Sequence, residues 1–291
     1  MKKLFVIGNP VKHSLSPEIH NHWLVKYKIN CVYEKLEFDK DPEKLEVQQK
    51  QLMSKIKSGE VVGVNITVPF KQRFQKYVDE TEQTAVRAQA INTVYRRDNK
   101  LIGTNTDGMG FYNSLSKDFN CSVPQVIHIL GSGGAAYGIL SALLSYNIKI
   151  VYISNRTESK AQIMVNHFKK IKKFSSTKFS VKDIYERLDS TVGLFINSSS
   201  IGMKGSEVDE SKFESLFTLL SRGTIVYDIN YNESQTIFNR LAEKQKINSE
   251  KILNGKFMLI RQAAESFNKW FGIKLTKKDI DEGIKILEKF I

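Results

Sequence analysis

Four short apolar segments recur in the second half of the chain, separated by stretches with helical periodicity. They read QVIHIL (125–130), KIVYIS (149–154), VGLFINSS (192–199) and TIVYDIN (224–230). Apolar strands that alternate with helices are typical of a parallel sheet, because crossover helices bury both faces of such a sheet. The pattern therefore predicts a doubly wound α/β domain in this part of the chain.

The first part of the chain also alternates strands and helices, and it ends in an expected hairpin. The sequence INTVYRRDNKLIGTNT carries a turn signal at Asp98-Asn99 between two apolar stretches. A helix over about 108–117 leads from this hairpin into the second series. We therefore expect a separate α/β domain here, with strands over 2–8, 32–38 and 63–71 and helices over 16–29 and 42–57.

A chain of 291 residues is long enough for two domains of ordinary size. We place the first domain at 1–106 and the second at 107–255. Residues 256–291 read as two helices without a strand, so they need an existing surface to pack on. We expect them to return to the first domain.

The distribution of charged residues indicates which kind of partner the chain binds. The net charge of +13 comes from lysines that are mixed with acidic residues, and the densest run, KKIKK at 169–173, falls late in a predicted amphipathic helix. Such a run is typical of a solvated helix face. We therefore expect no nucleic-acid partner, and attraction of anionic small molecules is a natural use of the charge. A salt-dependent DNA titration would test the nucleic-acid alternative.

Hydropathy and cysteine content indicate the compartment. No apolar stretch reaches the roughly 18 residues of a membrane span, and the apolar run Leu4–Ile7 is too short for a signal peptide. Cys31 and Cys121 lie far apart, without the spacing of a metal or redox site. These features predict a cytoplasmic protein with no membrane partner.

A glycine-rich loop, GSGGAA, follows the first strand of the second series. It has the form G-x-G-x-x-A between a predicted strand and a predicted helix, which is the setting of a Rossmann-type dinucleotide site. The glycines allow a tight turn and a close approach of the pyrophosphate to the helix N-terminus. Glycines can also end a strand for purely structural reasons. The residues expected to bind the cofactor here are Gly131, Ser132, Gly133, Gly134 and Ala135.

The end of the next strand indicates which dinucleotide binds. NAD sites usually offer an Asp or Glu about 20 residues after the loop, for the ribose 2′-hydroxyl. Here the strand ends without an acid, and Asn155, Arg156, Thr157 and Lys160 follow it. Arg156 can pair with a 2′-phosphate through its planar guanidinium. We therefore predict NADP as the cofactor; the structural alternative is a surface arginine in a loop.

The strand expected at 63–71, GVNITVPFK, alternates with a period of two, so its side chains divide between two faces. The apolar face belongs to the core, and the polar face meets either water or a ligand. The apolar set is Val64, Ile66, Val68 and Phe70, and the polar set is Asn65, Thr67 and Lys71.

Two serines precede the first helix, in GNPVKHSLSPEIHNHW. Ser16 stands before Pro17 and suits a helix N-cap. Together with Ser14 it also offers two hydroxyls beside a helix N-terminus, which suit a carboxylate. His20 and His22 share no helix face and have no Cys or acid partner in the sequence, so no metal site is predicted.

Seven motifs occur in an order and spacing that resemble those of the shikimate dehydrogenases, from about Val6 to Phe267. These enzymes use NADPH to reduce 3-dehydroshikimate to shikimate in aromatic amino-acid biosynthesis. The resemblance implies a substrate-binding domain at 1–106, an NADP-binding domain at 107–255 and C-terminal helices that return to the first. The motifs are GNPVKHSLSPEIHN, GVNITVPFK, AINTV, GTNTDGMGF, GSGGAA, SNRT and RQAAESF.

The resemblance also implies roles for individual residues. Lys71 and Asp107 would form the catalytic pair, and a lysine ammonium can stabilise a developing alkoxide and supply its proton. Gly255 would lie with the cofactor residues. The substrate residues would be Asn65 and Thr67 in the cleft, Asn92 and Gln262 on ring hydroxyls, and Ser14, Ser16 and Tyr231 on the carboxylate.

Some features leave alternatives open. A quinate/shikimate dehydrogenase of broader range that uses NAD is one alternative, and a catalytically silent nucleotide-binding regulator is another. The chain departs from the family pattern at Ser198, Phe257 and Glu233, where alanine, glycine and proline are common. A monomer and a homodimer are both compatible with the sequence.

Overall fold

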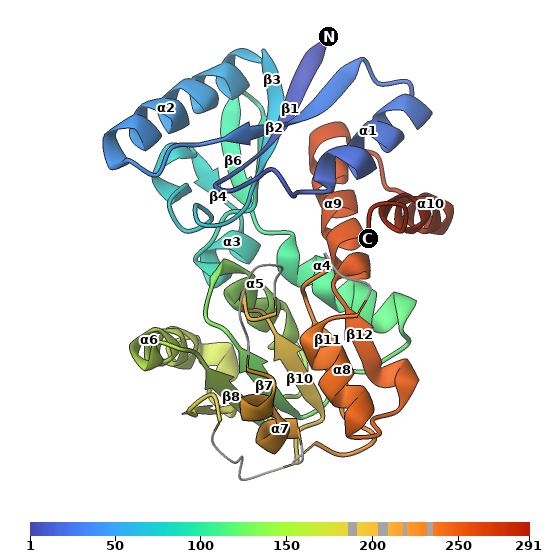
Figure 1. Ribbon diagram of the computed structural model, residues 1–291. Helices are drawn as coiled ribbons and strands as arrows, with labels where there is room; N and C mark the ends of the chain where they lie inside the picture. The colour runs from blue at the N-terminus through green and yellow to red at the C-terminus, as the bar shows by residue number, and fades with distance from the viewer. Residues whose placement is uncertain (186–190, 203–208, 218–219, 232–234) are drawn as a thin grey trace. The chain divides into compact units, whose positions relative to one another are not determined.

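In the computed structural model, the chain divides into two compact units (Figure 1). The first contains residues 1–111 and 259–290, and the second contains residues 112–258. Two helices, α4 (Asp107–Asn113) and α9 (Lys256–Phe271), run across the division. The structure describes residues 1–185, 191–202, 209–217, 220–231 and 235–291.

The first unit is a mixed sheet with helices against it. Among the described residues the sheet has six strands in the order β2-β1-β3-β5-β6-β4. β1 is parallel to β2 and β3, whereas β5 runs antiparallel to both of its neighbours. Its strands are β1 (Lys2–Gly8), β2 (Cys31–Glu37), β3 (Val61–Ile66), β4 (Glu80–Thr81), β5 (Thr93–Arg97) and β6 (Lys100–Thr104), and its other helices are α1 (Ser16–Lys26), α2 (Pro42–Ser58), η1 (Gln75–Tyr77), α3 (Gln83–Ala88) and α10 (Lys277–Leu287).

β3 shows why the two faces of this sheet differ. Val64 and Ile66 enter the apolar core that α2 covers. Asn65, between them, points to the other face and reaches Ser266 of α9. α2 and α9 accordingly lie on opposite sides of the strands (Figure 1). The period of two along β3 thus separates an apolar layer from a polar one.

The strand expected at 63–71 is wrong in its second half, because β3 ends at Ile66. Val68 was expected in the core but is 62% exposed. A turn follows the strand, in which the N–H of Phe70 donates to the carbonyl of Thr67 at 3.0 Å. Pro69 has no N–H to extend the ladder, so the alternation cannot continue through it. Phe70 still reaches the core, from the turn.

The predicted hairpin is confirmed. β5 and β6 pair antiparallel, from Thr93 with Thr104 to Arg97 with Lys100. Asp98 and Asn99 have φ of 49° and 62°, the left-handed conformations of a two-residue type I′ turn.

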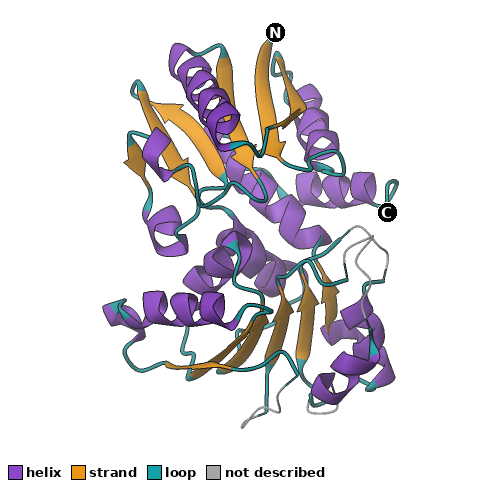
Figure 2. Cartoon of the chain, turned by 60° about the vertical axis from the view of Figure 1, so that its left-hand side comes forward, coloured by secondary structure: helices purple, strands orange, loops and turns teal. Residues whose placement is uncertain are grey.

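The second unit is a parallel sheet with helices on both faces (Figure 2). Its strand order among the described residues is β12-β11-β10-β7-β8-β9, which is the Rossmann order counted from β7. The predicted doubly wound fold is confirmed; β9 and β12 were not predicted. Its strands are β7 (Val126–Leu130), β8 (Ile150–Ser154), β9 (Lys178–Val181), β10 (Leu194–Asn197), β11 (Ile225–Asp228) and β12 (Ile252–Asn254), and its helices are η2 (Ser114–Asp118), α5 (Gly134–Leu143), α6 (Glu158–Lys169), η3 (Lys172–Phe174), α7 (Ser211–Phe217), α8 (Ile237–Lys244) and η4 (Ser249–Lys251).

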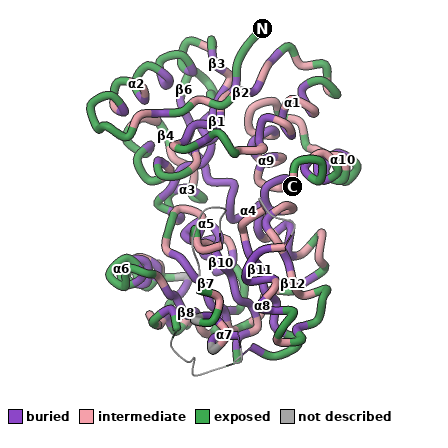
Figure 3. The backbone as a smooth tube through the Cα atoms, viewed as in Figure 1, coloured by how far each residue is buried: buried purple, intermediate pink, exposed green. Residues whose placement is uncertain are grey.

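Burial follows these layers. The strands of both units are largely buried, whereas α2 and α6 each expose one face (Figure 3). The basic run 169–173 was expected within a helix, but α6 ends at Lys169 and a turn with a 3₁₀ helix follows. No helix in the described part of the chain combines the length and apolar character needed to cross a membrane.

Candidate functional site

Lys71 and Asp107 form a close ion pair in the first unit. Nζ of Lys71 lies 2.6 Å from Oδ2 of Asp107, and the side chains are 14% and 6% exposed. Lys71 follows the turn after β3, and its carbonyl accepts from the N–H of Ile91 at 2.8 Å. Asp107 begins α4, where a helix N-terminus stabilises a carboxylate. The fold thus joins two residues that lie 36 positions apart.

Two asparagines hold Asp107 in place. Nδ2 of Asn92 donates to Oδ1 of Asp107 at 2.8 Å, so each carboxylate oxygen has a partner. Oδ1 of Asn105 accepts from the backbone N–H of Asp107 at 3.0 Å, which fixes the start of the helix. The carboxylate is therefore oriented before any ligand binds.

α9 brings Gln262 to the same cluster. The hydroxyl of Thr106 lies 3.4 Å from Oε1 of Gln262 and 3.2 Å from the hydroxyl of Ser266. Gln262 and Ser266 are four residues apart and therefore share a helix face. A Cβ at Gly110 would lie 2.7 Å from the backbone nitrogen of Gln262, so only glycine lets α4 approach α9 this closely.

The amide of Asn65 is occupied by protein partners. Its Oδ1 accepts from the hydroxyl of Tyr33 at 2.7 Å. Its Nδ2 lies within hydrogen-bond distance of Thr93 Oγ1 at 2.9 Å and Ser266 Oγ at 3.0 Å. Asn65 is 6% exposed. These contacts tie β2, β3, β5 and α9 together behind the ion pair.

Ser14, Ser16 and Thr67 belong to the first unit but are not joined to this cluster by contacts among the described residues. Ser16 was expected as the N-cap of α1; instead it is the first helical residue, and its side chain makes no cap bond. Oγ of Ser14 accepts from the N–H of Ser16 at 3.3 Å, so Ser14 provides a hydrogen-bond partner for a backbone N–H at the start of α1. Thr67 packs against Gly8 at the end of β1.

Tyr231 lies in the second unit, after β11. Burial raises the pKa of its phenol to about 12. The phenol is therefore protonated at neutral pH and can donate a hydrogen bond.

The glycine loop of the second unit has the geometry of an anion site. Gly131 has φ of +110°, and a Cβ there would lie 2.8 Å from Oγ of Ser198, so no other residue fits easily. A Cβ at Gly133 would meet nothing within 4 Å, which leaves open space before the first turn of α5. Oγ of Ser132 is buried without a hydrogen-bond partner among the described residues. A phosphate beside these groups would satisfy the hydroxyl and the free amides.

The end of β8 presents cationic side chains. Arg156, Thr157 and Lys160 are exposed, and Thr157 precedes the first residue of α6. Nδ2 of Asn155 donates to the carbonyl of Thr157 at 2.9 Å and orders the turn between them. Among the described residues the strand end carries no carboxylate, because Ser154 occupies its last position.

A polar cluster at the ends of β10 and β11 was missed by sequence reasoning. Nδ2 of Asn197 donates to Oδ1 of Asp228 at 2.9 Å, and the same oxygen accepts from the N–H of Asn230 at 3.0 Å. Oδ1 of Asn197 accepts from Ser199, so the cluster joins the loops after both strands. Burial raises the pKa of Asp228 to about 6. Ligands bind at the carboxyl ends of the strands in such sheets, so the polar residues at these strand ends could have been identified from the sequence.

Sequence reasoning also missed Asn105, Thr106 and Ser266. All three lie inside the motifs GTNTDGMGF and RQAAESF. Ser266 follows Gln262 by one helical turn, a spacing that could have identified it.

Two of the departures from the family pattern, Ser198 and Phe257, lie in the described part of the second unit. Oγ of Ser198 donates to the carbonyl of Leu130 at 2.9 Å, so the extra hydroxyl has a partner. Phe257 packs edge-on against Phe119, with ring centroids 5.0 Å apart. The N–H of Gly255 donates to Asn230 at 3.2 Å. Glu233 lies outside the described residues.

The histidines at the start of the chain have separate surroundings. His20 is fully buried and stacks on Tyr33 with ring centroids 4.4 Å apart, and burial lowers its pKa to about 3. His22 lies 3.2 Å from Glu282 of α10. In the described part of the chain, no three His, Cys, Asp or Glu side chains gather in a way that could hold a metal ion.

Known proteins resemble this chain over its whole length. A family profile described as "Shikimate dehydrogenase substrate binding domain" matches residues 6–94. A shikimate dehydrogenase (NADP(+)) of Pelagibacter ubique is 38% identical, over 99% of this chain and 100% of that protein. Another, of Caldicellulosiruptor saccharolyticus, is 36% identical over 100% of both chains.

Solved structures agree with these relatives. A shikimate dehydrogenase crystallised in complex with NADP+ superposes with a TM-score of 0.83 at 31% identity, covering 100% of this chain and 96% of that one. A shikimate 5-dehydrogenase of Listeria monocytogenes, in complex with shikimate and NAD, has a TM-score of 0.80 at 26% identity, covering 99% and 96%. With the matched profile and the full-length relatives, these likenesses show that the chain belongs to the shikimate dehydrogenase family.

Proposed function

We propose that this protein catalyses the reversible reduction of 3-dehydroshikimate to shikimate with NADPH, a step of aromatic amino-acid biosynthesis. The pairing of Lys71 with Asp107 at 2.6 Å carries the proposal, because ketone reduction needs a proton donor beside the reacting oxygen. The family of the chain supports the choice of substrate.

In this reaction, bound NADPH supplies the hydride. Lys71 faces the carbonyl oxygen, where its ammonium balances the charge of the developing alkoxide. Asp107 orients the ammonium through Oδ2, while Asn92 holds the other carboxylate oxygen. The pair therefore keeps a proton at the position where the new alcohol needs it.

The substrate residues divide by the group they bind. Ser14, Ser16 and Tyr231 bind the substrate carboxylate, since hydroxyl donors suit an anion. Thr67 lines the cleft, Gln262 binds a ring hydroxyl, and Asn92 binds another in addition to its contact with Asp107. Asn65 lines the cleft from behind: its amide is already bonded to Tyr33, Thr93 and Ser266, so it positions the others.

NADP binds to the second unit. The residues there fit a dinucleotide, because Gly133 leaves open space and the hydroxyl of Ser132 has no partner among the described residues. Arg156 meets the 2′-phosphate through its guanidinium, and the exposed charge of Lys160 adds to the attraction. The full proposed set is Gly131, Ser132, Gly133, Gly134, Ala135, Asn155, Arg156, Thr157, Lys160 and Gly255.

We also propose which part of the chain binds the substrate and which part binds NADP. We assign substrate binding to 1–106 with the helices of 256–291, and NADP binding to 107–255. The profile match to residues 6–94 supports the first assignment. We also propose a cytoplasmic location and a monomer or homodimer, which light scattering of the purified protein would distinguish.

Steady-state kinetics test the proposed function. Oxidation of shikimate and of quinate is measured with NADP and with NAD, by the absorbance of the reduced cofactor. We expect the highest kcat/KM for shikimate with NADP. Comparable values with quinate and NAD would favour the broader enzyme, and no turnover with any pair would favour a silent nucleotide-binding regulator.

A further inference from the structure

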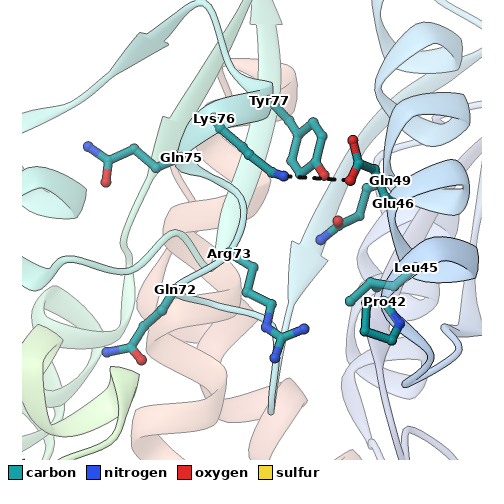
Figure 4. Close-up of a pocket in the computed structure, with 9 residues that line it drawn as sticks. All are labelled: Pro42, Leu45, Glu46, Gln49, Gln72, Arg73, Gln75, Lys76 and Tyr77. Atoms are coloured by element: carbon teal, nitrogen blue, oxygen red, sulfur yellow. Dashed lines mark ion pairs between the residues drawn. The ribbon is translucent and has the colours of Figure 1, made fainter.

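A cavity of about 410 Å³ lies in the first unit between α2 and the segment 72–77 (Figure 4). This volume falls within the range of about 300–1,000 Å³ that is common for small-molecule pockets. The cavity lies beyond the turn that carries Lys71, and none of its lining residues belongs to the proposed catalytic or substrate-binding set. The lining includes Pro42, Leu45, Gln49, Arg73, Lys76 and Tyr77.

Gln49 presents an unpaired donor to this cavity. The residue is 2% exposed, and its Nε2 has no hydrogen-bond partner among the described residues. Figure 4 shows its amide nitrogen pointing from α2 toward the segment that carries Arg73. The hydroxyl of Tyr77 is likewise buried without a partner in the described part of the chain. Buried polar groups are rarely left unpaired, so both groups indicate a missing partner.

The charges around the cavity favour an anion. The guanidinium of Arg73 has no ion-pair partner among the described residues, although it lines the cavity. Lys76 lies 4.9 Å from the centroid of the Tyr77 ring and 3.9 Å from Glu46, which is a long ion pair. Glu46 is held more closely by Lys50, at 2.8 Å. The negative charge of Glu46 is therefore partly neutralised by Lys50, and the side chains around the cavity carry a net positive charge.

Part of the wall is apolar, although Glu46, Gln72 and Gln75 also line the cavity. Leu45 is 2% exposed and meets the cavity beside Pro42. The Tyr77 ring also lines the cavity, beside Lys76 and Glu46 (Figure 4). A bare inorganic anion would leave this surface unused, whereas a ligand with a flat apolar body would cover it.

We propose that the cavity binds a small carboxylate that carries a flat apolar body. The carboxylate accepts two hydrogen bonds from the guanidinium of Arg73 and one from Nε2 of Gln49. The apolar body lies against Leu45 and Pro42. This is a second binding site, separate in its residues from the substrate site.

Benzoate is the probe for this site. It is titrated into the full-length protein labelled with ¹⁵N, and the side-chain amide signal of Gln49 is followed; the signal is assigned by its loss in Gln49→Leu. We expect saturable shifts with a Kd on the order of 1 mM, the range for a ligand of this size. The double variant Ser14→Ala/Ser16→Ala impairs only the proposed substrate carboxylate site. If benzoate binds in the cavity, this variant should therefore show the same Kd.

Three variants test whether benzoate binds at this cavity or is attracted by the positive charge of the protein as a whole. Arg73→Ala removes an exposed side chain and should weaken benzoate binding at least about 10-fold, the loss expected for a charge-assisted hydrogen bond. Arg222→Ala removes an exposed arginine of the second unit and should leave the Kd unchanged. Gln49→Leu, followed by calorimetry, should also weaken binding.

Two related probes test the chemistry. Benzamide has the same ring without the charge, and inorganic phosphate has the charge without the ring. Both should bind at least about 10-fold more weakly than benzoate. The proposal is overturned by equal binding of benzamide or phosphate, by a Kd that Arg73→Ala does not change, or by an amide signal of Gln49 that benzoate does not move.

Discussion

Nζ of Lys71 lies 2.6 Å from Oδ2 of Asp107, and the remaining carboxylate oxygen accepts from Asn92. Both charged side chains are largely withdrawn from water. Desolvation of a buried ion pair offsets much of its Coulombic attraction, so such a pair is weak support for stability. Its arrangement fits the role proposed for the pair, because ketone reduction requires a proton at the reacting oxygen.

Lys71→Ala should lower kcat by about 10²- to 10⁴-fold, the usual contribution of a general acid. The KM for shikimate should change much less, because the proposed contacts of Ser14 and Ser16 with the carboxylate remain. Kinetics of shikimate oxidation measure both values. Lys44→Ala, at an exposed lysine paired with Asp39 at 3.7 Å, is the control and should leave kcat unchanged. Near-normal turnover of Lys71→Ala would remove Lys71 from catalysis.

Asp107→Asn should also lower kcat, because the amide cannot hold the ammonium by charge. If the two residues act as a unit, the double variant with Lys71→Ala should be little slower than the slower single variant. A double-mutant cycle in kcat measures this coupling. Multiplied losses would show that the two residues act independently.

Ser14→Ala/Ser16→Ala should mainly raise KM, because a substrate carboxylate is held equally in the ground and transition states. The structure also separates the stability of the two single variants. Ser14 accepts from the N–H of Ser16, so Ser14→Ala should cost about 1 kcal/mol, whereas Ser16→Ala should cost little. Thermal melts of each single variant check this difference. An unchanged KM with a lowered Tm would assign the serines to the helix end alone.

Arg156→Ala should remove most of the preference for NADP. The charge-assisted hydrogen bonds proposed between Arg156 and a 2′-phosphate would be worth about 1.5–3 kcal/mol, or roughly 10- to 150-fold in affinity. We expect the native protein to prefer NADP by at least about ten-fold in kcat/KM, and NAD turnover to be nearly unchanged in the variant. A native protein that uses both cofactors equally would contradict the phosphate contact.

Asp228 should give the stability of the protein a pH dependence. Burial raises its folded pKa to about 6, above the ordinary value near 3.9, so the folded state binds the proton more tightly than the unfolded chain does. The free energy of unfolding should therefore fall as pH rises from about 4 to about 6, by up to ~3 kcal/mol. Urea unfolding across this range measures the slope.

Asp228→Asn should flatten that slope, because an amide does not titrate. The control is Asp281→Asn, at an exposed position of α10. It should leave the slope as in the native protein. An identical slope in Asp228→Asn would assign the pH dependence to other groups.

The hairpin, the parallel sheet and the glycine loop could be anticipated because their signals lie in short stretches of the chain. Asp98-Asn99 adopts the left-handed turn that its residue types favour. Apolar segments separated by helices led to a parallel, doubly covered sheet. β9 and β12 escaped notice because short edge strands have weak periodicity.

Local pattern failed where a neighbouring residue or a distant partner intervened. Alternation predicted a buried Val68, but Pro69 ends the ladder and turns the chain. Ser16 had the residue type of an N-cap, yet Ser14 accepts the bond at that helix end.

Motifs and periodicity were sufficient for the fold class and the cofactor expectation, since each is written in a short stretch of chain. The choice of Lys71 and Asp107 came from the resemblance to the shikimate dehydrogenases. Only the tertiary structure placed Lys71 and Asp107 2.6 Å apart. It also gave the amide of Asn65 hydrogen-bond partners within the protein, and it left Nε2 of Gln49 without a partner among the described residues. Such facts depend on which groups from distant segments meet after packing. Hydrogen-bond partners across more than 100 residues, as for Asn65 and Ser266, leave no periodic trace in the sequence.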